Sequence, residues 1–167
     1  MSCIVVETKM NFHVSAVALR GMDNMMISVI LMKLLFSIFS FAIALSDIKT
    51  GMVPRIAFVF AFPVFLILCL LSDDHNPPEV LATGALLGLF VFLAAYLVSK
   101  KKLGLADVWY AALVGLVLGP WWWYAAVLFA CITGIIYMLT SKKRKIPFIP
   151  LMAFGSVVAS IFQIFSR

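Results

Sequence analysis

Long apolar stretches recur along the whole chain, separated by only short polar intervals. Hydrophobic residues make up 65% of the 167 residues and charged residues 12%, whereas a typical soluble domain has about 25% charged residues. A helix needs roughly 20 mostly apolar residues to cross a bilayer, and several stretches approach that length. We therefore expect an all-α, polytopic membrane protein, with no room for a separate soluble domain.

Six stretches are predicted to be transmembrane helices. They cover about 26–45, 56–71, 80–98, 105–118, 121–139 and 148–165. The fourth is short: at 1.5 Å per residue it covers only about 20 Å of a hydrocarbon core of about 30 Å. We therefore expect one end of it to lie below the membrane surface. Residues 1–25 are a weakly patterned leader with several possible start methionines, and 26–167 form the membrane-embedded domain.

The basic residues predict how the helices are oriented. Nine of them lie in the alternate loops at 46–55, 99–107 and 140–147, and three lie on the opposite side. The nine are Lys49, Arg55, Lys100, Lys101, Lys102, Lys142, Lys143, Arg144 and Lys145. By the positive-inside rule these loops are cytoplasmic, so both termini are expected outside. This distribution explains the net charge of +6 without a nucleic-acid partner, which would need a continuous basic face.

Under this topology, Asp47 and Asp107 are the only acidic residues on the cytoplasmic side. A carboxylate beside hydrocarbon is costly, which makes each one a candidate functional residue. Two neighbouring carboxyl groups can share a proton, so that one activates water while the other protonates a carbonyl. Structural roles are the alternatives. Asp47 could cap its helix or pair with Lys49 or Arg55, and Asp107 could cap the N-terminus of the next helix.

Three segments together resemble a known family. The stretch from Asp47 to Pro54 and the stretch Gly104-Leu105-Ala106-Asp107 are similar to the two aspartate motifs of the prepilin and preflagellin leader peptidases. These belong to the GxGD class of membrane aspartic proteases. Residues 145–155, KIPFIPLMAFG, are similar to the IPFxP…G segment that opens the last helix of that family. The three occur in the family's order over about 26–165.

This resemblance implies a membrane aspartic endopeptidase with Asp47 and Asp107 as its catalytic residues. Its substrates would be type IV pilin-like precursors, whose short basic leader peptides it would remove at the cytoplasmic face of the inner membrane, without a metal or other cofactor. The cysteine-rich loop of full-length bacterial members is absent, so we expect no methyl transfer. The compact form resembles the enzymes of Tad-type pili or archaeal preflagellins. Residues expected to shape the site are Lys49, Gly51, Pro54, Gly104, Ala106, Pro147 and Pro150.

Two positions depart from the family pattern. Ala106 replaces the second glycine of GxGD, and Trp109 stands where the family usually has a lysine. The added methyl group could crowd a backbone that needs a positive φ or the close approach of a substrate. The alternative function is therefore an inactive or divergent relative that acts as a non-enzymatic membrane assembly subunit or a small transporter.

Other features of the sequence favour structural interpretations. Ser99 and Lys102 fit the SxxK pattern of serine–lysine proteases, but positive-inside bias explains this run of lysines. Lys33 suggests either a transport pathway or, as we expect, a side chain that snorkels to the interface. The cysteines form no CxxC pair that would indicate zinc or a disulfide framework.

Glycines and aromatic residues add two structural expectations. The GxxxG spacings Gly84…Gly88 and Gly115…Gly119 predict close helix packing. The aromatic run 121–124 is expected to form an interfacial belt at the outer boundary.

Overall fold

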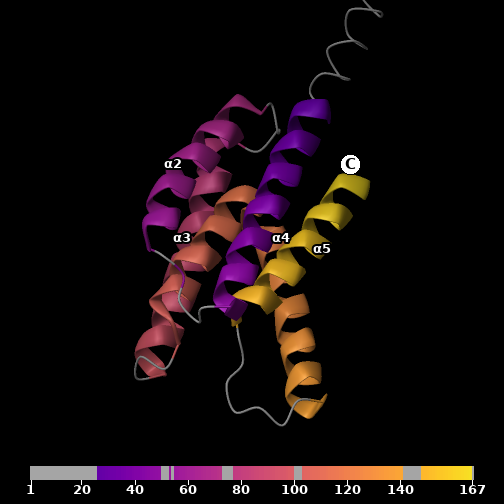
Figure 1. Cartoon of the computed structure of the whole chain (residues 1–167). Coiled ribbons are helices and arrows are strands. Elements are labelled where there is room, and N and C mark those ends of the chain that lie inside the picture. The colour runs from indigo at the N-terminus through magenta and orange to yellow at the C-terminus, as the bar shows by residue number, and fades with distance from the viewer. Residues whose placement is uncertain are drawn as a thin grey trace, which may run out of the picture.

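The chain forms a bundle of helices (Figure 1). The computed structural model describes residues 26–49, 53, 55–72, 77–99, 103–140 and 148–166, and their regular secondary structure is entirely α-helical. The helices are Met26–Lys49, α2 (Arg55–Leu71), α3 (Pro78–Val98), α4 (Leu105–Thr140) and α5 (Phe148–Phe165). All except α2 are long and apolar enough to cross a membrane. The all-α prediction is confirmed for these residues, whereas the six crossings and the outward termini stay predictions.

The helix α4 consists of two halves, 105–118 and 120–140, which meet at Gly119. This glycine has φ 76° and ψ 173°, a non-helical conformation that glycine adopts without a steric penalty. The proline that follows suits the first position of a new helix. The indole Nε1 of Trp123 donates a hydrogen bond to the carbonyl oxygen of Ala111 at 3.0 Å, although these residues would lie about 18 Å apart along a straight helix. The chain therefore folds back on itself at Gly119.

Glycine contacts hold α3 against the first half of α4. A Cβ atom added at Gly84 or Gly115 would overlap the backbone carbonyl of the other residue, and one at Gly88 would overlap that of Ala111. The predicted close packing is confirmed at these three glycines, and it occurs within one molecule. Gly119 serves the reversal instead. On the other side, Gly155 of α5 packs in the same way against the backbone of the second half of α4.

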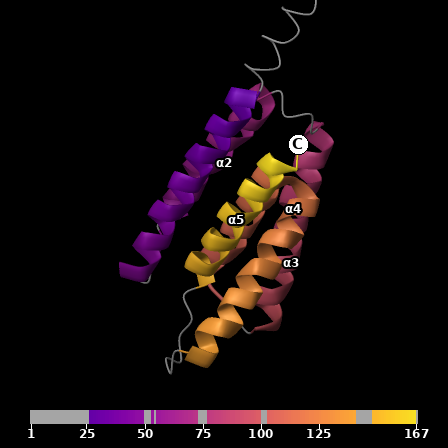
Figure 2. The same cartoon turned by 90° about the vertical axis from the view of Figure 1, so that its right-hand side faces the viewer.

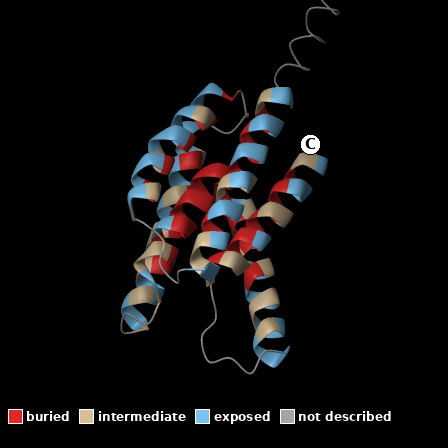
Figure 3. Ribbon diagram, viewed as in Figure 1, coloured by how far each residue is buried: buried red, intermediate tan, exposed pale blue. Residues whose placement is uncertain are grey.

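The first half of α4 is the centre of the bundle. Every residue from Tyr110 to Gly119 is buried, and the buried colour in Figure 3 is concentrated on this segment. A helix that is apolar on all sides is expected in such a position. Around it, large hydrophobic side chains on the other helices are exposed, far more than a soluble monomer presents to water. In Figure 2, α5 lies between the first helix and the second half of α4. The exposed apolar faces support a multi-pass membrane protein.

Two expectations about single residues are wrong. Lys33 does not snorkel to an interface: it is only 1% exposed. It shares its helix face with Val29, Phe36 and Ser40, which are also buried, so its stem points into the bundle.

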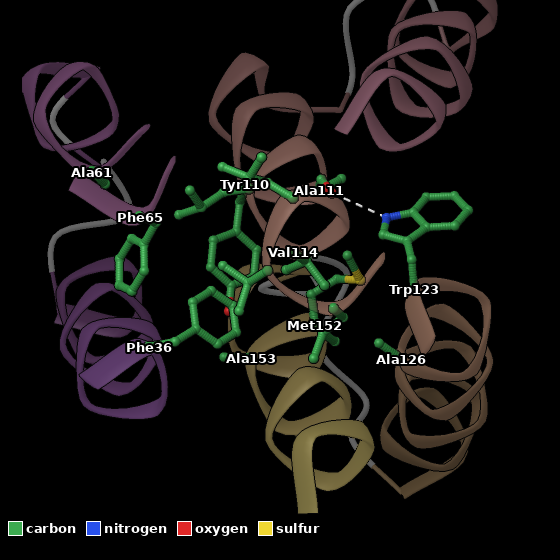
Figure 4. Packing of buried hydrophobic residues seen from close by; sticks show 14 of the residues in the cluster. Phe36, Ala61, Phe65, Tyr110, Ala111, Val114, Trp123, Ala126, Met152 and Ala153 are labelled. Carbon is green, nitrogen blue, oxygen red and sulfur yellow. Dashed lines mark hydrogen bonds between the residues drawn. The ribbon is translucent and has the colours of Figure 1, made fainter. Parts of the chain in front are cut away.

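Trp123 does not belong to an aromatic belt, because it is 1% exposed, whereas Trp121 is 83% exposed. The Gly119 reversal turns Trp123 inward, where its ring packs edge-on against Phe92 and its indole reaches Ala111 (Figure 4).

Candidate functional site

Asp107 lies in the first turn of α4 and is bonded to the residue just before the helix. Its Oδ2 atom accepts a hydrogen bond from the backbone N–H of Gly104 at 3.0 Å, and its own N–H donates to the Gly104 carbonyl oxygen at 3.1 Å. A carboxylate three residues into a helix that reaches back to the cap residue satisfies a backbone donor that the helix leaves free. The alternative that Asp107 caps this helix is therefore correct as a description of its geometry.

The same carboxyl group is also buried. Asp107 is 8% exposed, and Val108 and Tyr110 beside it are almost completely buried. A helix cap alone does not require burial, because caps are most often found in solvated turns. A buried carboxylate is unfavourable unless neighbouring groups compensate it. The burial of Asp107 is therefore not explained by its role as a helix cap.

The second aspartate meets the first at this end of the bundle. Asp47 lies in the last turn of the first helix and is half-buried. It interacts electrostatically with Asp107, although the two are far apart in the sequence. The first helix ends, and α4 begins, towards the same end of the bundle (Figure 1). Two carboxyl groups that interact electrostatically repel each other when both are ionised, which favours the protonated form of one of them.

Gly104 has a defined role in this geometry. A Cβ atom added there would lie 3.1 Å from Oδ2 of Asp107, closer than side chains normally pack. Glycine therefore leaves room for the carboxylate to turn back onto the backbone. Ala106 lies within the first helical turn of α4, where alanine is the most favourable residue. A positive φ is not needed there, which removes one of the two objections to alanine at this position.

The other predicted site residues make no contact with Asp107 that the described part of the structure shows. Lys49 is exposed at the end of the first helix, and Pro150 is half-buried in the first turn of α5, where proline costs no helix hydrogen bond. Next to it, Phe148 packs against Phe92 of α3 with ring centroids 5.5 Å apart. Gly51, Pro54 and Pro147 lie outside the described residues.

Trp109 contributes to packing on the opposite side of the helix from Asp107. It lines a cavity of about 350 Å³ together with Phe58, Val59, Phe62 and Leu105. Its ring meets that of Phe62 edge-on at 6.0 Å. Leu105 and Trp109 are four residues apart and share a face of the helix. Asp107 lies midway between them in the sequence and therefore points to the opposite side of the helix. The tryptophan at this position therefore links α4 to α2 and does not face the carboxyl groups.

A group of buried hydroxyls near the aspartates was not anticipated from the sequence. Tyr110 lies one turn after Asp107, and its hydroxyl is 3.3 Å from Oγ of Ser156 on α5. Ser40 of the first helix adjoins the same phenol. Figure 4 shows the Tyr110 ring pointing into the space between α4 and the segments that carry Phe36 and Ala153. The spacing from Asp107 to Tyr110, three residues on a helix, was the available signal.

Among the described residues, no three His, Cys, Asp or Glu side chains cluster so that they could hold a metal ion. The chemical groups that lie at this end of the bundle are two carboxyl groups and the backbone amide of Gly104.

Comparison with known proteins agrees with the motifs. Residues 34–139 match the type IV leader peptidase family. The match extends from the first helix to the end of α4, and so includes both aspartates, Gly104 and Ala106. No curated protein and no solved structure shows significant similarity to the chain.

Proposed function

The chain belongs to the type IV leader peptidase family, and from that premise we propose that it is an aspartic endopeptidase with Asp47 and Asp107 as its catalytic residues. Its substrates are type IV pilin-like precursors, from which it removes the short basic leader peptide. The observation that supports the proposal is that Asp47 and Asp107, 60 residues apart in the sequence, lie within electrostatic range of each other.

The proposed reaction needs one proton shared between the two carboxyl groups. The ionised carboxylate takes a proton from a water molecule as the water oxygen attacks the scissile carbonyl carbon, and the protonated partner donates its proton to the carbonyl oxygen. The tetrahedral intermediate then collapses: one of its hydroxyl groups gives its proton to the carboxyl group that is now ionised, the C–N bond breaks, and the other carboxyl group donates its proton to the leaving amine. The two acids return to their starting state with one proton between them.

The positions of the two aspartates are compatible with one carboxyl group activating water and the other protonating the carbonyl oxygen. Asp47 is half-buried and Asp107 is buried, so water reaches the pair most easily from the side of Asp47. Oδ2 of Asp107 is held by the Gly104 amide, and a fixed carboxyl group presents its other oxygen in a constant direction. Basic residues in the loops at this end, by the positive-inside rule, make it the cytoplasmic face of the inner membrane.

The proposal is tested by co-expressing the chain with a candidate precursor and following loss of the leader peptide on a gel. Wild type should cleave, and Asp47→Asn and Asp107→Asn should each abolish cleavage while the protein stays in the membrane. Glu79→Gln is the matched control, because Glu79 is an exposed acidic residue in the first turn of α3. Processing that survives either asparagine substitution would rule out the pair.

One observation favours the alternative of a small transporter. Lys33, Ser160 and Gln163 are buried inside the bundle, and buried polar residues at membrane depth commonly mark transport pathways. Lys33 lies fourteen residues before Asp47 on the first helix, a distance of about 21 Å along the axis. The peptidase proposal expects Lys33→Met to leave leader cleavage within about twofold of wild type. A wild-type chain that reaches the membrane but cleaves no precursor would favour the non-enzymatic alternative.

A further inference from the structure

Tyr110 connects the two helices that carry the aspartates. It lies three residues after Asp107, so the two side chains share a face of α4, and it is completely buried. We infer that Tyr110 is a positioning residue, whose hydroxyl group sets the placement of Asp107 relative to Asp47. The inference rests on the proposed function, since it concerns the geometry of the same pair.

The hydrogen bonds around the phenol have a definite direction. Ser156 Oγ donates its proton to the carbonyl oxygen of Ala153 at 2.9 Å. Its contact with Tyr110, at 3.3 Å, is therefore one in which the tyrosine hydroxyl donates and Ser156 accepts. The phenol oxygen keeps its lone pairs for a further donor, and the buried hydroxyl of Ser40, which makes no hydrogen bond among the described residues, lies near it.

Ser40 and Asp47 are on the same face of the first helix, because seven residues make two turns. The face that carries Asp47 is thus the face that meets Tyr110. The ring of Tyr110 also lies 6.4 Å from that of Phe58 on α2. The Tyr110 side chain therefore contacts α2 and α5 and lies near Ser40 of the first helix, while its backbone lies one turn from Asp107.

A hydroxyl group in such a position has a strong orienting effect. Leaving a buried polar group without a partner is costly, so the helices are favoured only in the arrangement that keeps the phenol bonded. The glycine contacts fix α4 against α3, and the hydrogen bond of Tyr110 adds a directional contact to α5. Catalytic groups displaced by about 1 Å can lose about 100-fold in rate. A small rotation of α4 would have this effect on Asp107.

The test compares Tyr110→Phe with wild type in leader cleavage. This change keeps the ring and removes only the hydroxyl, so we expect kcat to fall about 10-fold while KM stays within about twofold. Ser156→Ala should lower kcat in the same direction, and the double variant should be no worse than Tyr110→Phe alone, because both changes break one contact. Tyr124→Phe is the matched control on the exposed side of α4 and should cleave like wild type.

A second measurement reports the placement without relying on activity. Asp47→Cys and Asp107→Cys are combined in a chain whose Cys3, Cys69 and Cys131 are replaced by alanine, and the rate of thiol cross-linking is followed in membranes. Adding Tyr110→Phe should lower the cross-linking rate several-fold, because the residues at positions 47 and 107 are then no longer held at a fixed distance and orientation. Adding Tyr124→Phe should not change the rate.

The outcomes separate this inference from the proposed function. Tyr110→Phe with wild-type kcat would overturn the inference and leave the peptidase proposal intact. A fall in kcat with unchanged cross-linking would also overturn it, since the hydroxyl would then act other than by placement. If wild type cleaves no precursor, the proposed function fails, and the cross-linking rates alone decide the role of Tyr110.

Discussion

The two halves of α4 are both strongly apolar, but they are buried in different ways. From Tyr110 to Gly119 every residue is buried, whereas the second half is buried along a single stripe formed by Trp123, Ala126 and Ala130. The residues between these face outward, where several large hydrophobic side chains are exposed. Hydropathy does not distinguish a helix surrounded by protein from one that faces lipid. The carboxyl group of Asp107 belongs to the surrounded half, so its surroundings are set by protein contacts.

The largest effect should follow from adding a methyl group where the central half meets α3. Gly115→Ala would place a Cβ atom onto the backbone carbonyl of Gly84, and backbones cannot move apart without losing the packing around them. We expect a loss of about 3 kcal/mol in the free energy of unfolding, measured by unfolding in detergent and followed by circular dichroism.

The matched change in the outer half is Gly134→Ala. A Cβ atom there would meet only the tip of the Leu151 side chain, at 3.4 Å, and alanine is the better helix former by about 1 kcal/mol. We expect stability equal to wild type or higher. Equal losses at the two glycines would contradict the distinction between the surrounded and the outer half.

A smaller effect is expected at the point where the halves join. Gly119 has a positive φ, while a Cβ atom there would meet nothing closer than Val80 at 3.7 Å. Gly119→Ala should therefore reduce stability through backbone strain alone, by about 1–2 kcal/mol. Thermal unfolding of the variant in detergent measures this, and an unchanged midpoint would show that the reversal does not depend on glycine.

The smallest effect concerns the hydrogen bond that ties the halves together. Trp123→Phe removes the indole donor to the Ala111 carbonyl and should lower the free energy of unfolding by about 1 kcal/mol, since that buried carbonyl oxygen loses a partner. Trp121→Phe, at an exposed position two residues earlier, should leave stability unchanged. A similar loss in both variants would indicate that aromatic area, and not the hydrogen bond, is responsible.

The sequence was sufficient to locate the helices but not to orient them. A membrane allows a spanning chain little besides helices, so apolar length was enough to predict the helices 105–118 and 121–139, which form the two halves of α4. Which face of each helix points inward was not visible, because apolar residues occur on every side. For this reason the buried positions of Lys33 and Trp123 were missed.

The site shows the same limit. Asp47 and Asp107 could be identified as a pair because carboxylates are rare in such a chain and their motifs match a family. Tyr110 and Ser156 attracted no attention, because a tyrosine or serine in an apolar stretch is common and only three-dimensional contact reveals that they meet. Trp109 was noted as a departure from the family, and its contact with Phe62 gives it a physical reason.

The reversal at Gly119 has a consequence for how the protein is made. It joins two apolar helices through one glycine and one proline, and proline carries no N–H group that hydrocarbon would leave unsatisfied. We expect residues 105–140 to leave the translocation machinery and enter the bilayer as one helical hairpin. The segment that bears Asp107 would then reach its final depth only after synthesis has passed well beyond it.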